Sequence, residues 1–317
     1  MEHTDKLLSV VIPAYNEEGN IDTVAAAVSA ALSEHDIPYE IIFINDGSTD
    51  GTWAEICSQA SQHTEISGID FSRNFGKEAA ILAGLSAAEG ACATVMDCDM
   101  QHPPETLPEM YAKWQEGYEI IEGVKADRGR EKPEHRISAG IFYRIMSRAT
   151  GIDMSRSSDF RLLDRKAVRA ILSLPERNMF FRALSSWIGY RTATVEFSVH
   201  ERFRGTTKWS TFRLIKYALS NIMSFTSAPM QLVTGLGLFT LVTAVVIGIQ
   251  TLVKYASGTA VEGFTTVIIL LLFIGSIIMI CMGITGCYIA KIYEEVKGRP
   301  RYIISDTAGR ERNGEDR

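Results

Sequence analysis

Two aspartates that stand one residue apart, Asp97 and Asp99, are the first candidates for metal chemistry in this chain of 317 residues. They directly follow a short apolar run, residues 92–96, which predicts a buried strand. Because side chains alternate along an extended segment, both carboxylates point toward the same side. Carboxylate oxygens suit Mg²⁺ and Mn²⁺, and such an ion can share its remaining positions with phosphate oxygens. A D-x-D pair alone is a weak signal, because two solvated carboxylates of a turn would have the same spacing.

Polar residues also follow three earlier apolar runs, at residues 8–13, 40–45 and 66–71, which predict further strands. These polar residues are Tyr15, Asn16 and Glu17 after the first run, Asp46 after the second, and Arg73 and Asn74 after the third. Helical segments separate the strands, and this alternation predicts an α/β domain with a mostly parallel sheet and helices on both faces. Such sheets bind ligands at the carboxyl ends of their strands, so the four loops predict one site.

The two familiar phosphate-binding loops are absent from this sequence. No predicted strand is followed by G-x-G-x-x-G, and G-x-x-x-x-G-K-[ST] does not occur. A dinucleotide-dependent dehydrogenase and a P-loop ATPase therefore have little support. A nucleotide diphosphate bound at this sheet needs another source of positive charge, and a divalent metal held by Asp97 and Asp99 would supply it.

The net charge and the cysteines of the chain indicate which ligands it binds and which compartment it faces. A formal net charge of -6 argues against a nucleic-acid-binding protein, which normally carries a basic surface. The five cysteines form no C-x-x-C pair, as expected for reduced thiols in a chain that faces the cytosol. The first apolar run is not followed by a cleavage site of small residues, so we expect no secretory signal and a cytosolic N-terminal domain.

Two apolar segments, residues 232–253 and 264–290, each exceed the about 20 residues that span a bilayer. Basic residues flank the pair on both sides. They are Arg202, Arg204, Lys208, Arg213 and Lys216 before it, and Lys291, Lys297, Arg299 and Arg301 after it. By the positive-inside rule we expect two transmembrane helices with both chain ends in the cytoplasm. Apolar residues also recur at near-helical spacing over residues 212–225, which predicts a helix in the membrane interface or, alternatively, a helix that faces a core.

Seven motifs, read together, are far more specific than the D-x-D pair alone. They are VVIPAYNEE (residues 10–18), INDGSTDGT (44–52), FSRNFGKEAA (71–80), DCDMQHPPE (97–105), SDFRLLDR (158–165), LPERNMFFRALSSWIGY (174–190) and ERFRGTTKWS (201–210). In content and order they resemble the family 2 glycosyltransferases with the GT-A fold. The closest resemblance is to the polyprenyl-phosphate glycosyltransferases, which include bactoprenol glucosyltransferases and dolichol-phosphate mannose synthases. The resemblance implies an inverting, metal-dependent hexosyltransferase.

The resemblance assigns most of the loop residues to the nucleotide-sugar donor. The positions that hold the nucleobase and ribose are Pro13, Tyr15, Glu17 and Asp46, and those that line the rest of the donor pocket are Arg73, Lys77 and Asp97. The position of the principal ligand of Mg²⁺ or Mn²⁺ is Asp99, with Asp97 and Gln101 assisting. A carboxylate at Asp46 can accept from uracil or from guanine, so it does not identify the base, and an Asx turn is its alternative role. Lys77 could equally be a solvated residue of a first helical turn.

Asp159 occupies the position of the family's catalytic carboxylate. The acceptor implied by the resemblance is a phosphate monoester, whose second pKa of about 6 leaves it largely ionised at neutral pH. Such an acceptor hardly needs a base, so whether Asp159 removes a proton or orients the acceptor stays open. The competing role is a structural acid paired with Arg161 or Arg165.

Arg202, Thr207 and Lys208 match the family's R-x-x-G-x-[ST]-K element. Cations at these positions would stabilise the departing nucleoside diphosphate, where negative charge grows in the transition state. Contact with lipid headgroups is the alternative role of the same basic residues.

The sequence thus predicts four segments. They are a cytosolic GT-A catalytic domain (residues 1–209), an amphipathic interfacial helix (210–228), a two-helix transmembrane hairpin (229–292) and a cytosolic tail (293–317), disordered from Thr307 onward. The expected location is the inner or plasma membrane. The oligomeric state stays open, a homo-oligomer included.

The leading functional hypothesis is transfer of a hexose, glucose by preference, from a UDP-sugar to undecaprenyl phosphate or a related polyprenyl phosphate. UDP-GlcNAc, a 4-amino-arabinose donor and GDP-mannose would leave the motifs nearly unchanged. A processive polysaccharide synthase would carry a Q-x-x-R-W element and more spans, whereas residues 180–183 read FFRA and two spans are predicted. A non-catalytic nucleotide-sugar binder would be expected to lack Asp99, Asp159 or Lys208, and all three are present.

Overall fold

The computed structural model describes residues 6–126, 157–176, 180–198, 228–257 and 263–309. The chain divides into two compact units. The first comprises Met1–Trp209 together with Arg299–Arg317, and the second comprises Ser210–Gly298. The segment that follows the second unit therefore returns to the first.

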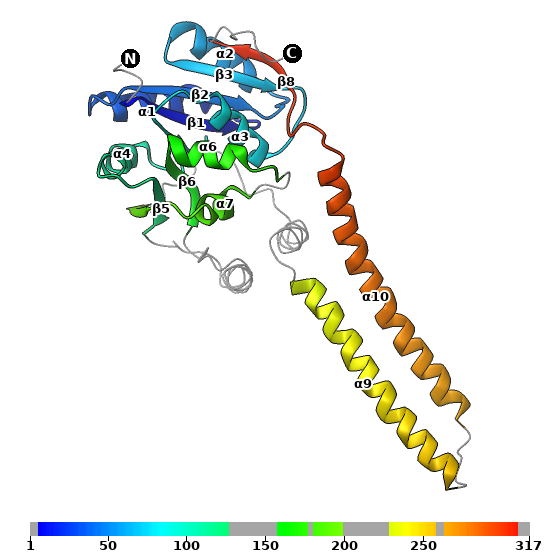
Figure 1. The fold of residues 1–317 in the computed structure, drawn as a ribbon. Coiled ribbons are helices and arrows are strands. Elements are labelled where there is room, and N and C mark those ends of the chain that lie inside the picture. The colour runs from blue at the N-terminus through cyan, green and yellow to red at the C-terminus, as the bar shows by residue number, and fades with distance from the viewer. Residues whose placement is uncertain (1–5, 127–156, 177–179, 199–227, 258–262, 310–317) are drawn as a thin grey trace. The chain divides into compact units, whose positions relative to one another are not determined.

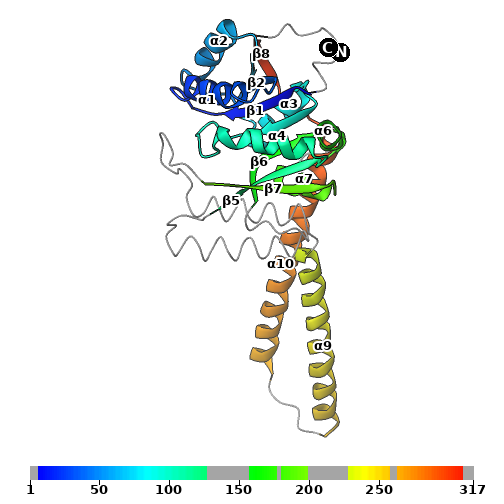
Figure 2. The same ribbon diagram turned by 90° about the vertical axis from the view of Figure 1, so that its left-hand side faces the viewer.

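An eight-stranded sheet forms the centre of the first unit, with the strand order β7-β5-β6-β4-β1-β2-β3-β8 (Figures 1 and 2). The strands are β1 (Leu8–Ala14), β2 (Tyr39–Asn45), β3 (Ile66–Phe71), β4 (Cys92–Val95), β5 (Ile120–Lys125), β6 (Ser157–Asp164), β7 (Thr192–Phe197) and β8 (Ile304–Ala308). β4, β1, β2 and β3 are parallel, as are β5 and β7. β6 runs antiparallel to β4 and β5, and β8 runs antiparallel to β3. The predicted α/β architecture, with parallel strands at the centre, is confirmed.

Helices cover both faces of the sheet because its central strands are apolar on both sides, as β1 illustrates. Val10 and Ile12 of β1 belong to the core that includes α1 (Ile21–Ser33), whereas Val11 faces α3 (Lys77–Ala87). Gly84 permits the close approach of α3, because a Cβ atom there would overlap the Val11 side chain. The unit also contains α2 (Thr52–Gln62), the short 3-10 helix η2 (Pro104–Thr106), α4 (Leu107–Gln115), α6 (Arg165–Ser173) and α7 (Phe181–Trp187).

Strand β8 corrects the expectation of a disordered tail from Thr307 onward. Thr307 lies within the strand and pairs with Ile69 of β3. The sequence hides this strand because Ser305 and Asp306 are polar and exposed, whereas the backbone hydrogen bonds that hold an edge strand do not depend on side-chain type. Residues 310–317 lie outside the described part of the chain.

Two long helices, α9 (Ala228–Ala256) and α10 (Phe264–Val296), form the described part of the second unit. Within them, Val233–Gln250 and Phe273–Val296 have mean hydropathies of 1.9 and 2.0. Both helices are long and apolar enough to cross a membrane, so they are candidate membrane spans.

The spans predicted at residues 232–253 and 264–290 lie within α9 and α10. Of the predicted interfacial helix, only Ala228 lies among the described residues, and there it is the first residue of α9. The interfacial helix therefore stays a prediction.

Candidate active site

The carboxyl ends of the central strands meet at one edge of the sheet. Ala14, the last residue of β1, lies opposite Asn45, the last residue of β2, and Val11 of β1 lies opposite Val95, the last residue of β4. The loops that follow these strands carry the residues that the sequence assigned to a site. Their convergence is the arrangement expected for a parallel sheet that binds a ligand at this edge.

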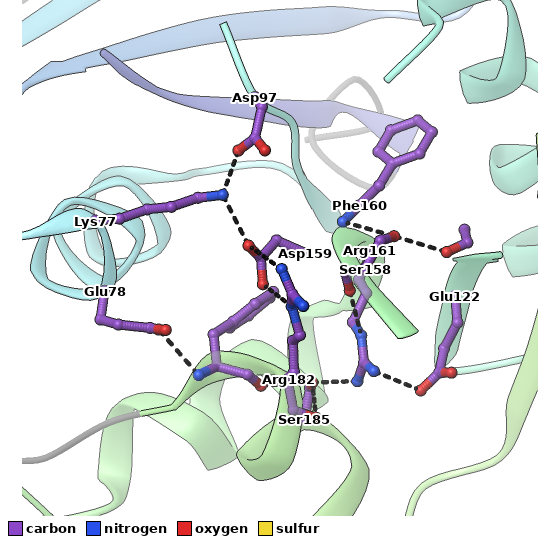
Figure 3. Close-up of polar contacts among 12 residues, drawn as sticks. Lys77, Glu78, Asp97, Glu122, Ser158, Asp159, Phe160, Arg161, Arg182 and Ser185 are labelled. Carbon is purple, nitrogen blue, oxygen red and sulfur yellow. Dashed lines mark hydrogen bonds and ion pairs between the residues drawn. The ribbon is translucent and has the colours of Figure 1, made fainter. Parts of the chain in front are cut away.

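Lys77 joins two of the predicted site residues in one ion-pair cluster (Figure 3). Its Nζ atom lies 2.5 Å from Oδ1 of Asp97 and 2.7 Å from Oδ2 of Asp159. Lys77 begins α3, Asp97 follows β4 and Asp159 lies on β6, so the cluster connects three elements. Desolvation acts to lower the pKa of the Lys77 ammonium, but the charges of Asp97 and Asp159 raise it above its ordinary value. Lys77 is therefore not merely a solvated first-turn residue.

Arg182 of α7 holds Asp159 from the other side. Its Nε atom donates to Oδ1 at 2.6 Å and its Nη2 atom donates to Oδ2 at 3.0 Å, a bidentate arrangement. The Asp159 side chain is only 8% exposed. Burial alone would raise its pKa, but the charges of Lys77 and Arg182 and their hydrogen bonds hold the pKa well below its ordinary value. Asp159 is therefore an ionised carboxylate held between two cations.

The ion-pair partners of Asp159 differ from those that the sequence analysis named for a structural role. Arg161 Nη2 lies 3.0 Å from Oε1 of Glu122 on β5, and Arg165 Nε donates to the Gly90 carbonyl at 2.8 Å. Both arginines thus have other partners. The pairing named in the alternative role is therefore corrected, and the ion-pair partners of Asp159 are Lys77 and Arg182. The reason is the sheet register, which places Glu122 directly opposite Arg161 on the neighbouring strand.

Contacts at both of its ends anchor α7, the helix that carries Arg182. At its start, the Phe181 backbone N–H donates to Oε2 of Glu78 at 2.9 Å. Further along, the buried Arg161 guanidinium donates to the Ser185 hydroxyl and, at 3.0 Å, to that of Ser186. Burial, together with the charge of the nearby Asp159, raises the pKa of Glu78 to about 7. The position of Arg182 is therefore set by residues of α3 and β6.

Asp46 connects the loop after β2 to residues 72–76, which we call the donor loop. Its carboxylate accepts from the backbone N–H of Phe75 at 2.7 Å and from that of Gly76 at 3.0 Å. Burial raises the pKa of Asp46, although these hydrogen bonds and the charge of Arg73 act in the opposite direction. The neighbouring Asn45 binds the following turn, because its Oδ1 accepts from the Ser48 N–H at 3.3 Å. A carboxylate has about four acceptor positions, so Asp46 can still accept from a base.

Arg73 lies on the surface of the donor loop, with its guanidinium carbon 4.1 Å from the centroid of the Phe75 ring. This cation–π contact favours one position of the Arg73 side chain although the side chain is exposed. Gly47, with a φ of 64°, lies against the backbone of the same loop, where a Cβ atom would come within 2.6 Å of the Asn74 nitrogen. The donor loop therefore packs closely on the end of β2.

The other three residues assigned to the base and ribose lie at the end of β1 or just after it. Pro13 lies in β1 opposite Ile44, and the Tyr15 ring is 47% exposed. The Glu17 N–H donates to Thr52 Oγ1 at 2.9 Å, and its Oε2 accepts from Asn20 at 2.6 Å. These contacts bring the first loop against the start of α2. Pro13, Tyr15 and Glu17 thus lie at the same edge of the sheet as Asp46, and the roles of these four residues in binding stay a prediction.

Asp97 and Asp99 occupy one tight turn after β4, in which Met100 has a φ of 59°. Oδ1 of Asp99 accepts from the Gln101 N–H at 3.1 Å. Within the described residues, no group of three or more His, Cys, Asp and Glu side chains could hold a metal by itself. Two carboxylates are nonetheless a sufficient protein contribution for Mg²⁺ when substrate phosphates and water complete the coordination. The turn fits an ion that binds together with a diphosphate, and these ligands stay a prediction.

His102 supports this turn and was missed by the sequence analysis. Its Nδ1 atom accepts from the Asp97 N–H at 3.1 Å, and its ring stacks on Phe160 with centroids 4.9 Å apart. Burial lowers the pKa of His102 despite the nearby Asp97 charge, so the ring is neutral at pH 7. His102 therefore fixes the backbone at Asp97 by packing and by one hydrogen bond.

Arg182 and Glu78 were also missed as site residues. Both lie inside quoted motifs, FFRA and GKEAA, but nothing in their spacing indicates that α3 and α7 meet at Asp159. The basic element with Arg202, Thr207 and Lys208 lies outside the described residues, so its role stays a prediction.

Comparisons with known proteins agree with this geometry. The family model described as Glycosyl transferase family 2 matches residues 9–172. An uncharacterised glycosyltransferase of Synechocystis is 39% identical over 306 residues, which cover 96% of each chain. The SfII prophage-derived bactoprenol glucosyl transferase of Shigella flexneri is 36% identical over 302 residues, which cover 94% of this chain and 97% of that protein.

Solved structures confirm the fold. Glucosyl-3-phosphoglycerate synthase from Mycobacterium tuberculosis, in complex with Mn²⁺, UDP-glucose and phosphoglyceric acid, superimposes with a TM-score of 0.52. The alignment covers 69% of this chain and 78% of that one at 19% identity. This likeness shows the GT-A fold that the motifs implied.

Proposed function

The chain belongs to glycosyl transferase family 2, and from this premise we propose that it transfers glucose from UDP-glucose to undecaprenyl phosphate. The observation that carries the proposal is the extent of the similarity to the bactoprenol glucosyl transferase of Shigella flexneri. The alignment covers 94% of this chain, and the remainder is shorter than α9 or α10, which have 29 and 33 residues. The similarity therefore extends through the catalytic unit into both candidate spans.

The proposed reaction joins an oxygen of the lipid phosphate to the anomeric carbon of the sugar. The bond from that carbon to the diphosphate breaks, its electron pair leaves with UDP, and the configuration at the carbon inverts. The attacking phosphate, with a second pKa of about 6, is largely ionised at neutral pH. Stabilising the negative charge that gathers on the departing diphosphate is therefore the main task of the protein.

The cluster around Asp159 supports a role in placing the acceptor. Arg182 and Lys77 fix the Asp159 carboxylate from two sides, so its oxygens have defined directions. Lys77 also contacts Asp97, so one cation lies between the donor side and the acceptor side of the site. We assign Lys77 to the donor diphosphate and Asp159 to the orientation of the acceptor.

In this proposal Asp99 is the principal ligand of Mg²⁺ or Mn²⁺, with Asp97 and Gln101 assisting, and a bound ion supplies positive charge to the diphosphate. Asp97 is engaged by Lys77 at 2.5 Å, which favours Asp99 as the principal ligand. The Mycobacterium tuberculosis synthase of the same fold was solved with Mn²⁺ and UDP, which supports use of a divalent ion. Arg202, Thr207 and Lys208 would add cations to the same diphosphate.

The proposed location is the cytoplasmic face of the inner or plasma membrane. α9 and α10 would form the hairpin of residues 229–292, preceded by the interfacial helix of residues 210–228. The catalytic domain of residues 1–209, together with β8, would stay in the cytoplasm, because basic residues flank the hairpin on both sides.

A donor screen tests this proposal. The purified full chain is incubated with undecaprenyl phosphate, Mg²⁺ or Mn²⁺ and one of four donors, and release of nucleoside diphosphate is measured with and without the lipid. UDP-glucose should give the fastest lipid-dependent release. Faster release from UDP-GlcNAc, a 4-amino-arabinose donor or GDP-mannose would show that the transferred sugar is not glucose. Equal release of nucleoside diphosphate without the lipid would contradict undecaprenyl phosphate as the acceptor. No release with any donor would favour a non-catalytic nucleotide-sugar binder.

A further inference from the structure

Residues 301–304, which follow α10 in sequence, lie against the donor loop. Ser72 is the first residue of that loop, and its backbone N–H donates to the Ile303 carbonyl at 3.0 Å. The Tyr302 ring stacks on the buried Phe71 ring with centroids 5.0 Å apart and an angle of 11° between the planes. Arg301 Nη2 donates to the Leu174 carbonyl, just beyond α6, at 2.6 Å. The segment is thus attached on both sides of its aromatic contact.

An irregularity in β8 places Tyr302 at this point. Asp70 pairs with Asp306 but Phe71 pairs with Ile304, so Ser305 is an additional residue on β8. Such a bulge bends the strand and redirects the side chains beyond it. The ring of Tyr302 therefore meets Phe71 at the end of β3, where the donor loop begins.

A continuous series of ring contacts leads from Tyr302 to Arg73. Phe71 makes an edge contact with Phe75 at 5.7 Å, and the Arg73 guanidinium lies over the Phe75 ring at 4.1 Å. On the opposite side, Asp46 holds the Phe75 N–H at 2.7 Å. The donor loop is therefore held between the end of β2 and the C-terminal segment.

The same loop leads directly into the catalytic cluster. Gly76, with a φ of 99°, is the N-cap of α3, and the next residue is Lys77, which contacts Asp97 and Asp159. A displacement of Phe75 would therefore change both the Arg73 side chain and the start of α3. The contacts of Tyr302 limit such a displacement.

We propose that Tyr302 is a positioning residue for the nucleotide-sugar donor, acting through Phe71 and Phe75 on the donor loop. The inference rests on the proposed function for the identity of the donor. It assigns a role in donor affinity to a residue that lies, in sequence, beyond both candidate spans. Tyr302 itself does not need to touch the donor.

The test compares three variants of the full chain, Tyr302→Ala, Tyr302→Phe and Ile303→Ala. Tyr302→Ala removes the stack, Tyr302→Phe retains it, and Ile303→Ala changes an exposed side chain of the same segment without altering its backbone carbonyl. We expect Tyr302→Ala to raise KM for UDP-glucose about three- to tenfold, the range that corresponds to one aromatic pair. Its KM for undecaprenyl phosphate and its kcat should stay within about twofold of wild type, since the loop acts on the donor. Ile303→Ala should match wild type, and Tyr302→Phe should stay closer to wild type than Tyr302→Ala because it retains the stack.

Two results would overturn the role of Tyr302. One is an unchanged KM for UDP-glucose in Tyr302→Ala. The other is an equal loss in both KM values and kcat with a lower Tm, which indicates a purely structural residue. If Tyr302→Ala does not fold, Tyr302→Leu, which keeps apolar volume without the stack, is measured with the same expectations.

A failure of the proposed function gives a different result. In that case wild type transfers no glucose, and the affinity for UDP with Mn²⁺ is measured by calorimetry instead. A weaker affinity in Tyr302→Ala, restored in Tyr302→Phe, supports the positioning role, and an equal affinity in all variants overturns it.

Discussion

Lys77 Nζ lies 2.7 Å from Oδ2 of Asp159, although 82 residues separate the two in sequence. The contact links the first turn of α3 to β6 and makes the candidate catalytic carboxylate part of a charged cluster. Because Lys77 also contacts Asp97, the proposed metal ligand Asp97 and the proposed acceptor-orienting Asp159 share one cation. The ion pairs fix the Asp159 oxygens before any substrate binds.

Asp159→Asn should lower kcat while the affinity for the donor stays nearly constant. A group that acts on the acceptor step contributes up to about 10²–10⁴-fold when it transfers a proton, and less when it only orients. Steady-state kinetics and UDP binding measure the two effects separately.

Asp164→Ala is the matched control on the same strand, because Asp164 caps α6 by accepting from Lys166 N–H at 2.8 Å. It should cost about 0.5–2 kcal/mol of stability without lowering kcat. If Asp159→Asn behaves like this control, its role is structural.

Asp99→Asn should abolish transfer and weaken binding of UDP-glucose, and excess EDTA should do the same to wild type. The reason is the loss of the ion that neutralises the diphosphate. Glu105→Gln, a change at an exposed carboxylate near the same turn, should leave both properties unchanged. Turnover that persists in excess EDTA would show that the metal is dispensable.

Glu78→Gln should make stability less dependent on pH. Burial and the charge of Asp159 raise the pKa of Glu78 from 4.5 to about 7, so its stabilising contribution is full below about pH 4.5 and is lost as pH rises through 7. Wild type should therefore lose Tm relative to Glu78→Gln between pH 5 and pH 8. The glutamine oxygen can still accept from the Phe181 N–H, so α7 should keep its position. A constant Tm difference across this range would mean that Glu78 does not titrate there.

Asp306→Asn should stabilise the attachment of β8. Asp306 lies directly opposite Asp70 across the antiparallel ladder, and burial together with the Asp306 charge raises the pKa of Asp70. Removing one of two opposed like charges should add about 0.2–1 kcal/mol to the free energy of unfolding at pH 7. Hydrogen exchange of the β8 amides measures the effect, with Asp306→Glu as the control that keeps the charge. Faster exchange in Asp306→Asn would contradict the repulsion.

The central fold could be predicted from the sequence because its signals are local. The apolar runs at residues 8–13, 40–45, 66–71 and 92–96 correspond to β1–β4 within one residue at each end. Apolar residues dominate β1 and β4, and the Ile41–Ile44 stretch of β2 is apolar on both faces, whereas β3 also carries Ser67 and Asp70. The loops at the strand ends then follow from the parallel order.

The parts that could not be predicted depend on contacts between distant segments. The alternative structural role considered for Asp159 paired it with Arg161 or Arg165, two and six residues away. The cross-strand register instead pairs Arg161 with Glu122, and Asp159 pairs with Lys77 and Arg182. β8 escaped notice because its side chains are polar and its pairing is made by the backbone. Neither the partners of Asp159 nor the pairing of β8 with β3 can be identified from one continuous stretch of residues.

The place of β8 in the sheet also changes how the two candidate membrane spans are to be classified. The chain leaves the catalytic unit before Ser210 and re-enters it at Arg299, so α9 and α10 are an insertion within a domain rather than an anchor added to its end. Truncation after residue 209 would remove β8, which pairs with β3, and Tyr302, whose ring stacks on Phe71. Excising residues 210–298 and rejoining the flanks through a flexible linker would retain both. A soluble form of the catalytic domain should therefore be sought by excision, with the C-terminal segment kept in the same polypeptide.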